Sequence, residues 1–349
     1  PQQQQQPQHS NSKSSLSLSF SPMFRVTASL SRSLNCLRQA PGHGSVQRAL
    51  SSAPAETIGF IGLGQMGSRM AANLLKHNRA VCVFDVSAEA LSQAQQQGAS
   101  VASSPAELAS RSKTILTMLP SSPHVESVYA DENTGVFGSM YADSLLIDCS
   151  TVDIDVSRSL AKRASALGSH FLDAPVSGGT KGAQDGTLTF MCGGEEKTFE
   201  RAEPVLSLMG GKVARCGDNG SGLAAKLANN LALGIQMIGI AEAFHLGVSQ
   251  GVDPKALNAI LNASTAGCWS SRVNNPVPGV LETSPASNNY QGGFASMLMR
   301  KDLNLALNAG KDLPLTLGAT ALQFYNLLTS HGYGAKDFGV IYEFLTKKQ

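Results

Sequence analysis

A lysine interrupts a long apolar stretch in the second half of the chain. The stretch GLAAKLANNLALGIQMIGIAEAFHLGV begins at Gly222 and carries Lys226, Asn229 and Asn230 near its start. At helical spacing Lys226 and Asn230 lie on one face, because they are four residues apart. Burial lowers the pKa of a lysine, and the neutral amine can then accept a proton near neutral pH. The pattern favours proton transfer by Lys226. The alternative is a lysine whose ammonium reaches solvent from the helix end.

A group of glycines has the spacing of a dinucleotide-binding turn. Gly62, Gly64 and Gly67 form GxGxxG, and Asp85 stands 18 residues after the last of them. In this motif the first glycine makes a tight turn, the second lets a pyrophosphate approach, and the third lets the helix pack on the strand. The acidic residue binds the adenosine ribose and repels a 2′-phosphate. The sequence therefore predicts NAD rather than NADP as cofactor.

These residues need a scaffold, and the first half of the chain has alternating strand and helix patterns. Strands are predicted at 58–61, 81–84, 114–119, 145–149, 170–172, 188–192 and 212–216, and helices at 66–76 and 153–167. Ser104 to Glu107 reads as a capping box with Pro at the first helical position. The alternation indicates an α/β Rossmann-type dinucleotide-binding domain over 56–221. Ligands bind at the carboxyl ends of such strands, so Leu119-Pro120 and Ser150-Thr151 are expected to flank the nicotinamide.

The apolar stretch that contains Lys226 is long enough to suggest a membrane span. Its polar residues, which include Gln236 and Glu242, argue against one. A long helix that leads from the α/β domain into a second domain fits better. Further helix signals follow, among them Asp253 as an N-cap before Pro254. We expect an all-α C-terminal domain over 222–349, joined to the first domain by this long helix.

The first 55 residues differ from the rest. They hold five of the 27 basic residues and none of the 25 acidic ones, and they are rich in serine. An Arg- and Ser-rich segment without acids is typical of a mitochondrial transit peptide, although a plastid leader or a plain disordered tail would also fit. Met23 is a candidate start. We expect a mitochondrial matrix protein with a disordered transit peptide over 1–55.

Charge and cysteine usage exclude other classes. Beyond residue 55 the chain has 22 basic and 25 acidic residues, which gives no basic footprint for nucleic acid. The histidines lack metal-ligand spacing, so no metal is expected. The cysteines outside the leader are odd in number, form no CxxC, and read as buried free thiols: Cys82, Cys149, Cys192, Cys216 and Cys268.

Several motifs together resemble a known family. They are GFIGLGQMG at 59–67, DAPVSGG at 173–179, GTLTFMCGG at 186–194 and GLAAKLANN at 222–230. These are similar to motifs of the β-hydroxyacid dehydrogenase family. Three segments of the second half resemble the members that act on 3-hydroxyisobutyrate: CWSSRVNNPVPGV at 268–280, NNYQGGF at 288–294 and RKDLNLA at 300–306.

The resemblance implies a role for each matching position. Lys226 corresponds to the catalytic lysine, and Asn230 to the residue that orients the substrate hydroxyl. Substrate contacts are implied for Ser177, Gly178, Gly179, Phe294 and Asp302, the first three as the loop that holds the carboxylate. Cofactor contacts are implied for Gly62, Gly64, Gln65, Met66, Gly67, Asp85, Leu119, Pro120, Thr151 and Lys301. His124 departs from the family pattern, which has Asn at this position.

The activity that the resemblance implies is NAD-dependent oxidation of 3-hydroxyisobutyrate to methylmalonate semialdehyde, a step of valine catabolism, with Lys226 as general acid–base. The expected partners are the small hydroxy acid and further copies of the chain, as a homodimer or homotetramer, and neither nucleic acid nor membrane. Alternatives are a glyoxylate or succinic semialdehyde reductase, which would favour NADPH, a 6-phosphogluconate dehydrogenase, and a dinucleotide-binding scaffold without catalysis.

Overall fold

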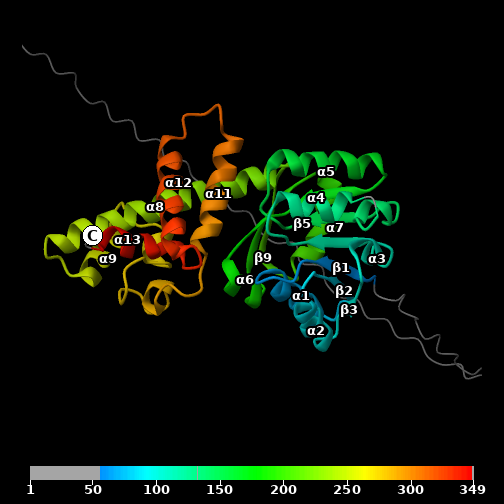
Figure 1. Ribbon diagram of the computed structural model, residues 1–349, viewed down its shortest axis with the longest axis horizontal. Coiled ribbons are helices and arrows are strands. Elements are labelled where there is room, and N and C mark those ends of the chain that lie inside the picture. Colours follow the sequence, from blue (N-terminus) through cyan, green and yellow to red (C-terminus); the bar gives the residue numbers. More distant parts are fainter. Residues whose placement is uncertain (1–55, 132, 348–349) are drawn as a thin grey trace, which may run out of the picture. The chain divides into compact units, whose positions relative to one another are not determined.

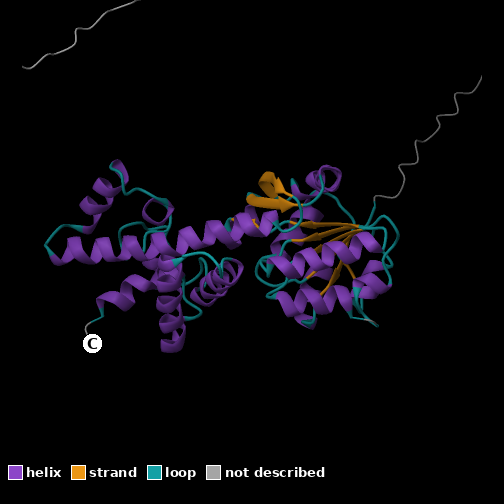
Figure 2. Ribbon diagram, turned by 90° about the horizontal axis from the view of Figure 1, so that it is seen from above, coloured by secondary structure: helices purple, strands orange, loops and turns teal. Residues whose placement is uncertain are grey.

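The computed structural model describes residues 56–131 and 133–347. The predicted leader, 1–55, lies outside these residues. The described part of the chain holds an α/β domain with one mixed sheet, followed by a domain of helices (Figures 1 and 2). The fold class predicted from the sequence is confirmed.

The sheet runs in the order β3-β2-β1-β4-β5-β6-β8-β7, with β9 paired to β8. The six strands from β3 to β6 are parallel to their neighbours, whereas β8 runs antiparallel to β6 and β7. The strands are β1 (Ile58–Ile61), β2 (Val81–Phe84), β3 (Ser100–Val101), β4 (Thr114–Thr117), β5 (Leu145–Asp148), β6 (His170–Asp173), β7 (Val176–Ser177), β8 (Leu188–Gly193) and β9 (Gly210–Gly217). Because β1 to β6 are parallel, the loops that follow them gather at one edge of the sheet.

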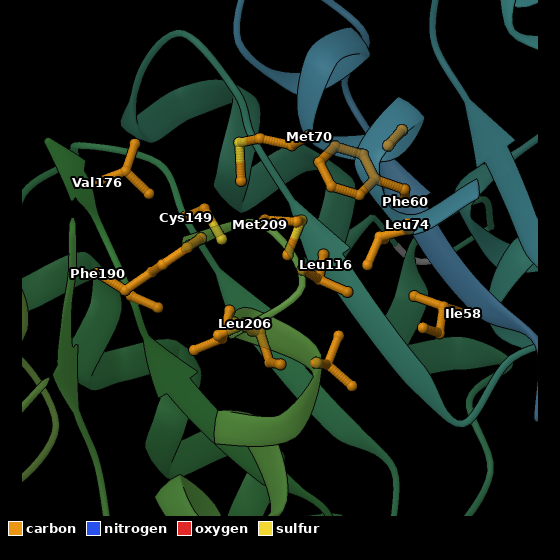
Figure 3. Close-up of a cluster of buried hydrophobic side chains, with 14 of the residues drawn as sticks. Ile58, Phe60, Met70, Leu74, Leu116, Cys149, Val176, Phe190, Leu206 and Met209 are labelled. Carbon is orange, nitrogen blue, oxygen red and sulfur yellow. The ribbon is translucent and has the colours of Figure 1, made fainter. Parts of the chain in front are cut away.

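Helices cover both faces of the sheet because its central strands are apolar on both sides. One apolar cluster joins the sheet to α1 (Gly67–Lys76), α2 (Ala88–Gln96), α6 (Gly179–Asp185) and α7 (Glu196–Leu206). Figure 3 shows part of this cluster, in which Met70 and Leu74 of α1 meet strand residues such as Phe60. The second cluster joins the other face to α3 (Pro105–Ala109), α4 (Ser122–Ala130) and α5 (Ile154–Ala166).

The helix α8 (Ser221–Ser249) connects the two domains (Figure 1). Its first turns pack on β8 and β9, and its later turns pack on the helices of the second domain. These are α9 (Pro254–Ala263), α10 (Trp269–Arg272), α11 (Ser296–Ala309), α12 (Thr316–Leu328) and α13 (Ile341–Thr346). Tyr290, Tyr325 and Phe338 are buried in the apolar cluster of this domain. The second domain therefore has its own core.

By length and composition α8 could also cross a membrane, with a mean hydropathy of 1.5 over its most apolar window. It packs on both domains, and 33% of that window is buried within the described chain. The side chains of Lys226 and Asn230 are buried against other parts of the protein, so neither faces the surroundings of the helix.

Three sequence-based details were wrong. The strands expected at 114–119 and 145–149 end at Thr117 and Asp148, where the chain turns into loops. Only half of the capping box forms. Ser104 Oγ accepts from Glu107 N at 3.1 Å, but the Glu107 carboxylate accepts from Ser103 N at 2.7 Å rather than from Ser104 N. Two of the cysteines are not buried: Cys216 is exposed and Cys268 is half-buried. The first lies on the edge strand β9 and the second caps α10.

Candidate active site

The glycine turn after β1 has the geometry of a dinucleotide cradle. Gly62 has a φ of 95°, and a Cβ there would collide with the Met118 carbonyl oxygen. A Cβ on Gly67 would collide with the Gly62 carbonyl oxygen, so the helix packs closely on the turn. A Cβ on Gly64 would meet open space. That open space lies at the N-terminus of α1, where unpaired N–H groups favour a phosphate. The residues present therefore fit the pyrophosphate of NAD.

Asp85 lies beside this turn and is tied to it. Its Oδ2 accepts from Leu63 N at 2.6 Å, and its Oδ1 accepts from Ser87 N at 2.8 Å. The two bonds fix the carboxylate next to the turn and leave a lone pair on each oxygen for ribose hydroxyls. Gln65 and Met66 complete the turn, with Met66 at the N-cap of α1.

Two further loops meet at the carboxyl ends of β4 and β5. Leu119 N donates to Ser150 Oγ at 2.8 Å, which joins the loop that holds Leu119-Pro120 to the loop that holds Ser150-Thr151. His124, where the family pattern differs, lies in the first turn of α4, and its Nδ1 is 2.7 Å from Ser121 Oγ. The ring is thus engaged locally, close to the first of these loops.

Lys301 of α11 reaches across to both loops. Its Nζ donates to the Thr151 carbonyl at 2.7 Å and to the Pro120 carbonyl at 3.4 Å. The same Nζ lies 3.2 Å from Asp302 Oδ1. The second domain is therefore bonded directly to the loops expected at the nicotinamide, and Asp302 lies next to that connection.

Lys226 and Asn230 are both buried on α8, with 7% and 1% of their surface exposed. Asn230 Nδ2 donates to Asp302 Oδ2 at 2.6 Å, and Asn229 Nδ2 donates to Asn230 Oδ1 at 3.0 Å. Burial lowers the pKa of Lys226, the negative charge of Asp302 opposes that change, and the charge of Lys301 adds to it. The solvent-reaching alternative for Lys226 is thereby excluded.

The remaining site candidates lie on two other segments. Ser177 ends β7, and Gly178 and Gly179 follow with φ values of 135° and 63° at the start of α6. Both φ values are positive, a conformation that glycine adopts readily, and they turn the chain from β7 into α6. Phe294 lies just before α11. Its N–H donates to Asp337 Oδ2 at 2.8 Å, and its ring packs edge-on against Phe338.

Buried aspartates that were not predicted as site residues support this site. Asp173 ends β6 and accepts from Gly220 N at 2.6 Å and from Leu223 N at 3.0 Å, so it caps α8. Asp148 ends β5, and burial raises its pKa to about 6. Asp337 holds Phe294, and burial likewise raises its pKa to about 6. An acid at the end of an apolar strand run was the available signal for the first two.

Comparison with known proteins agrees with this geometry. Residues 57–217 match the family model for the NAD binding domain of 6-phosphogluconate dehydrogenase. Residues 220–345 match the model described as the NAD-binding domain of NADP-dependent 3-hydroxyisobutyrate dehydrogenase. The chain is 50% identical over 302 residues to the probable mitochondrial 3-hydroxyisobutyrate dehydrogenase of Dictyostelium discoideum, covering 86% of this chain and 94% of that protein. The chain belongs to the 3-hydroxyisobutyrate dehydrogenase family.

Two more members of the 3-hydroxyisobutyrate dehydrogenase family are similar to this chain over most of its length. The human mitochondrial enzyme is 45% identical over 315 residues, which cover 90% of this chain and 94% of that protein. A solved structure of the Mycobacterium tuberculosis 3-hydroxyisobutyrate dehydrogenase with L-serine superposes with a TM-score of 0.80 at 39% identity, and covers 84% of this chain and all of that one. Within this family the present chain uses NAD, and the carboxylate of Asp85 beside the glycine turn agrees with that cofactor.

Proposed function

We propose that this chain oxidises 3-hydroxyisobutyrate to methylmalonate semialdehyde with NAD, as a step of valine catabolism. The observation that carries the proposal is the buried Lys226 beside the Asn230–Asp302 pair, on a helix domain that Lys301 bonds to the loops after β4 and β5. NAD, when bound, supplies the acceptor for the hydride that leaves the hydroxyl-bearing carbon.

In this proposal Lys226 Nζ takes the proton of the substrate hydroxyl. A lysine with an ordinary pKa is protonated near neutral pH and cannot do so, whereas burial increases the neutral fraction of Lys226. In the reverse reaction the protonated amine returns the proton. The side chain thus serves as general base in one direction and as general acid in the other.

Asn230 orients the substrate oxygen, and Asp302 orients Asn230. The Asn230 amide has two N–H groups, and Asp302 accepts one of them at 2.6 Å. The second N–H is left for the substrate hydroxyl. Asp302 also places a negative charge near Lys226, which keeps the lysine basic enough to remove the proton.

The substrate carboxylate is assigned to Ser177, Gly178 and Gly179, through backbone N–H groups and the serine hydroxyl. Phe294 forms an apolar wall of the pocket. Cofactor contacts are assigned to the glycine turn with Gln65 and Met66, to Asp85, and to Leu119, Pro120, Thr151 and Lys301. The domains are assigned as 56–221 for NAD and 222–349 for substrate and subunit contacts.

Assembly into a homodimer or homotetramer is also proposed. Most large apolar side chains that are exposed in the described chain lie on the helical domain, between Leu246 and Leu327. Exposed apolar surface of this kind favours association between copies. Sedimentation analysis at several concentrations tests this: a monomer at all of them contradicts it.

The mitochondrial matrix is the proposed location. Relatives from Dictyostelium discoideum and human are named mitochondrial, and residues 1–55 lack acids. Fusing these residues to a fluorescent protein should direct it to the matrix, and a diffuse cytosolic signal would contradict the proposal.

L-serine is the second candidate substrate, because it accompanies the Mycobacterium tuberculosis relative and is a β-hydroxy acid with an ammonium in place of the methyl group. The deciding experiment is a substrate panel with NAD and with NADP: 3-hydroxyisobutyrate, 3-hydroxypropionate, L-serine, glycerate and 4-hydroxybutyrate. The highest kcat/KM is expected for 3-hydroxyisobutyrate with NAD. A higher value for L-serine or 4-hydroxybutyrate overturns the substrate, and a strong preference for NADP favours a glyoxylate or succinic semialdehyde reductase. NAD binding without turnover of any hydroxy acid indicates a scaffold.

A further inference from the structure

The carboxylate of Asp148, at the end of β5, accepts several hydrogen bonds. Only 1% of this residue is exposed. Its Oδ1 accepts from Thr117 Oγ1 at 2.7 Å, from Ser150 Oγ at 2.6 Å and from Ser150 N at 3.1 Å. Three donors on one buried oxygen fix the side chains of Thr117 and Ser150 in place, because none of these groups can turn to water instead.

The Ser150 hydroxyl also bonds to the neighbouring loop and so fixes that loop relative to Asp148. The hydroxyl donates a hydrogen bond to Asp148, so its oxygen remains free to accept one. It accepts from Leu119 N at 2.8 Å. Pro120, the next residue, has no N–H of its own. The Leu119 amide therefore ties the Leu119-Pro120 loop to the loop after β5, alongside the bond from Asp153 N to Ser122 Oγ at 3.0 Å.

The same connection continues into the helical domain. Thr151 follows Ser150 directly, and its carbonyl accepts from Lys301 Nζ at 2.7 Å. Lys301 in turn lies next to Asp302, which holds Asn230. Polar contacts, joined at one point by the peptide bond between Ser150 and Thr151, thus run from the sheet to the residues that surround Lys226.

We propose that Asp148 is a positioning residue for NAD: through the Ser150 hydroxyl it sets the two loops that receive the nicotinamide end of the cofactor and presents them to Lys301. The inference rests on the proposed function only for the roles of Lys226 and Asn230. Asp148 itself touches neither substrate nor cofactor in this assignment, and it acts through Ser150.

The unpartnered oxygen of Asp148 makes a sharp test possible. Asp148 Oδ2 is buried and has no hydrogen-bond partner in the described chain. In Asp148→Asn the amide nitrogen can take that side while the carbonyl oxygen keeps the three donors. Asp148→Ala removes the acceptor altogether, whereas Ser150→Ala removes the link to Leu119 together with one of the three bonds to Asp148. The matched control is Ser157→Ala on α5. The Ser157 hydroxyl is also fully buried but, unlike that of Ser150, has no hydrogen-bond partner in the described chain.

Two readouts are measured on each purified variant. The first is hydrogen exchange of the peptide that contains Leu119, without cofactor. The second is the Kd for NADH, from the fluorescence of the bound nucleotide. In Ser150→Ala and Asp148→Ala we expect faster exchange at Leu119 and an NADH Kd raised about tenfold, the effect of losing roughly one hydrogen bond. Asp148→Asn and Ser157→Ala should stay within about twofold of the wild type, at most about a third of that bond's free energy.

The proposal is overturned if Ser150→Ala matches Ser157→Ala in both readouts, or if Asp148→Asn is as impaired as Asp148→Ala. The first result would show that the Ser150 hydroxyl is not needed to position the loop. The second would show that NADH binding depends on the charge of Asp148 rather than on its hydrogen bonds. Failure of the proposed function shows differently, because a wild-type protein that binds NADH but oxidises no hydroxy acid leaves this binding series intact.

Discussion

Asn230 on α8 and Asp302 on α11 are joined by a buried hydrogen bond of 2.6 Å, from the amide Nδ2 to the carboxylate Oδ2. The pair is separated by 72 residues of sequence, and it packs the two helices that carry Lys226 and Lys301. It places a buried polar contact in the second domain, close to Lys226 and Lys301. The same carboxylate acts on Lys226 through its charge.

Replacing this carboxylate should move the pH dependence of the reaction. In Asp302→Asn the side-chain oxygen can still accept from Asn230, but the negative charge that raises the pKa of Lys226 is lost. The pKa of the lysine then falls further, so the acidic limb of kcat/KM for oxidation moves to lower pH, by about half a pH unit or more. The control Asp312→Asn changes an exposed carboxylate of the same domain. An unchanged or oppositely shifted limb in Asp302→Asn would contradict the electrostatic link.

A methyl group on Gly64 should separate folding from cofactor binding. Because a Cβ there meets no atom within 4 Å, Gly64→Ala should fold with an unchanged Tm. The methyl group would occupy the space of the pyrophosphate, so the Kd for NADH should rise at least about tenfold. The control Gly239→Ala adds a methyl group to open space on α8 and should leave the Kd unchanged. NADH affinity equal to wild type in Gly64→Ala would show that the cradle is misassigned.

Burial of Lys226 should lower stability, with a pH dependence of known sign. Its pKa is lower in the folded protein than its ordinary value of 10.5. Between these two values the unfolded chain binds more protons, so the free energy of unfolding rises with pH across that window. Lys226→Met removes this dependence and should be more stable at pH 7, by about 1–2 kcal/mol.

Urea unfolding at several pH values measures this effect. The control is Lys162→Met, which replaces an exposed lysine of α5 and should keep the slope of the wild type. If Lys226→Met were less stable than the wild type at pH 7, favourable contacts of the lysine would outweigh the cost of its burial, which contradicts this prediction.

Residue spacing alone could reveal those parts of the site whose geometry is formed within one short segment of the chain. The glycine turn and the helix start at Pro254 follow from spacing within a few residues, and Asp85 from its place 18 residues after the turn. The structure has the turn and the helix where the sequence predicted them. Lys226 stood out because a lysine is rare in an apolar helix. The roles of Phe294, Lys301 and the Ser177 loop came from family resemblance, since their own spacing is unremarkable.

The buried aspartates show why the rest was not predictable. Asp148, Asp173 and Asp337 each bond to groups on other segments, as Asp173 does with Gly220 N, 47 residues away. In the sequence each is one acid after an apolar run or within a loop. Its importance arises only when the fold buries it and brings donors to it. Exposure of Cys216 has the same origin, since nothing local marks β9 as an edge strand.

The most direct test of the central claim is the rate of 3-hydroxyisobutyrate oxidation by purified Lys226→Ala, measured together with its Kd for NADH. A positioned acid–base group contributes about 10²–10⁴-fold, so kcat should fall within that range while the Kd stays within about twofold of wild type. Retention of most of the rate by Lys226→Ala would contradict the assignment of Lys226 as the proton acceptor.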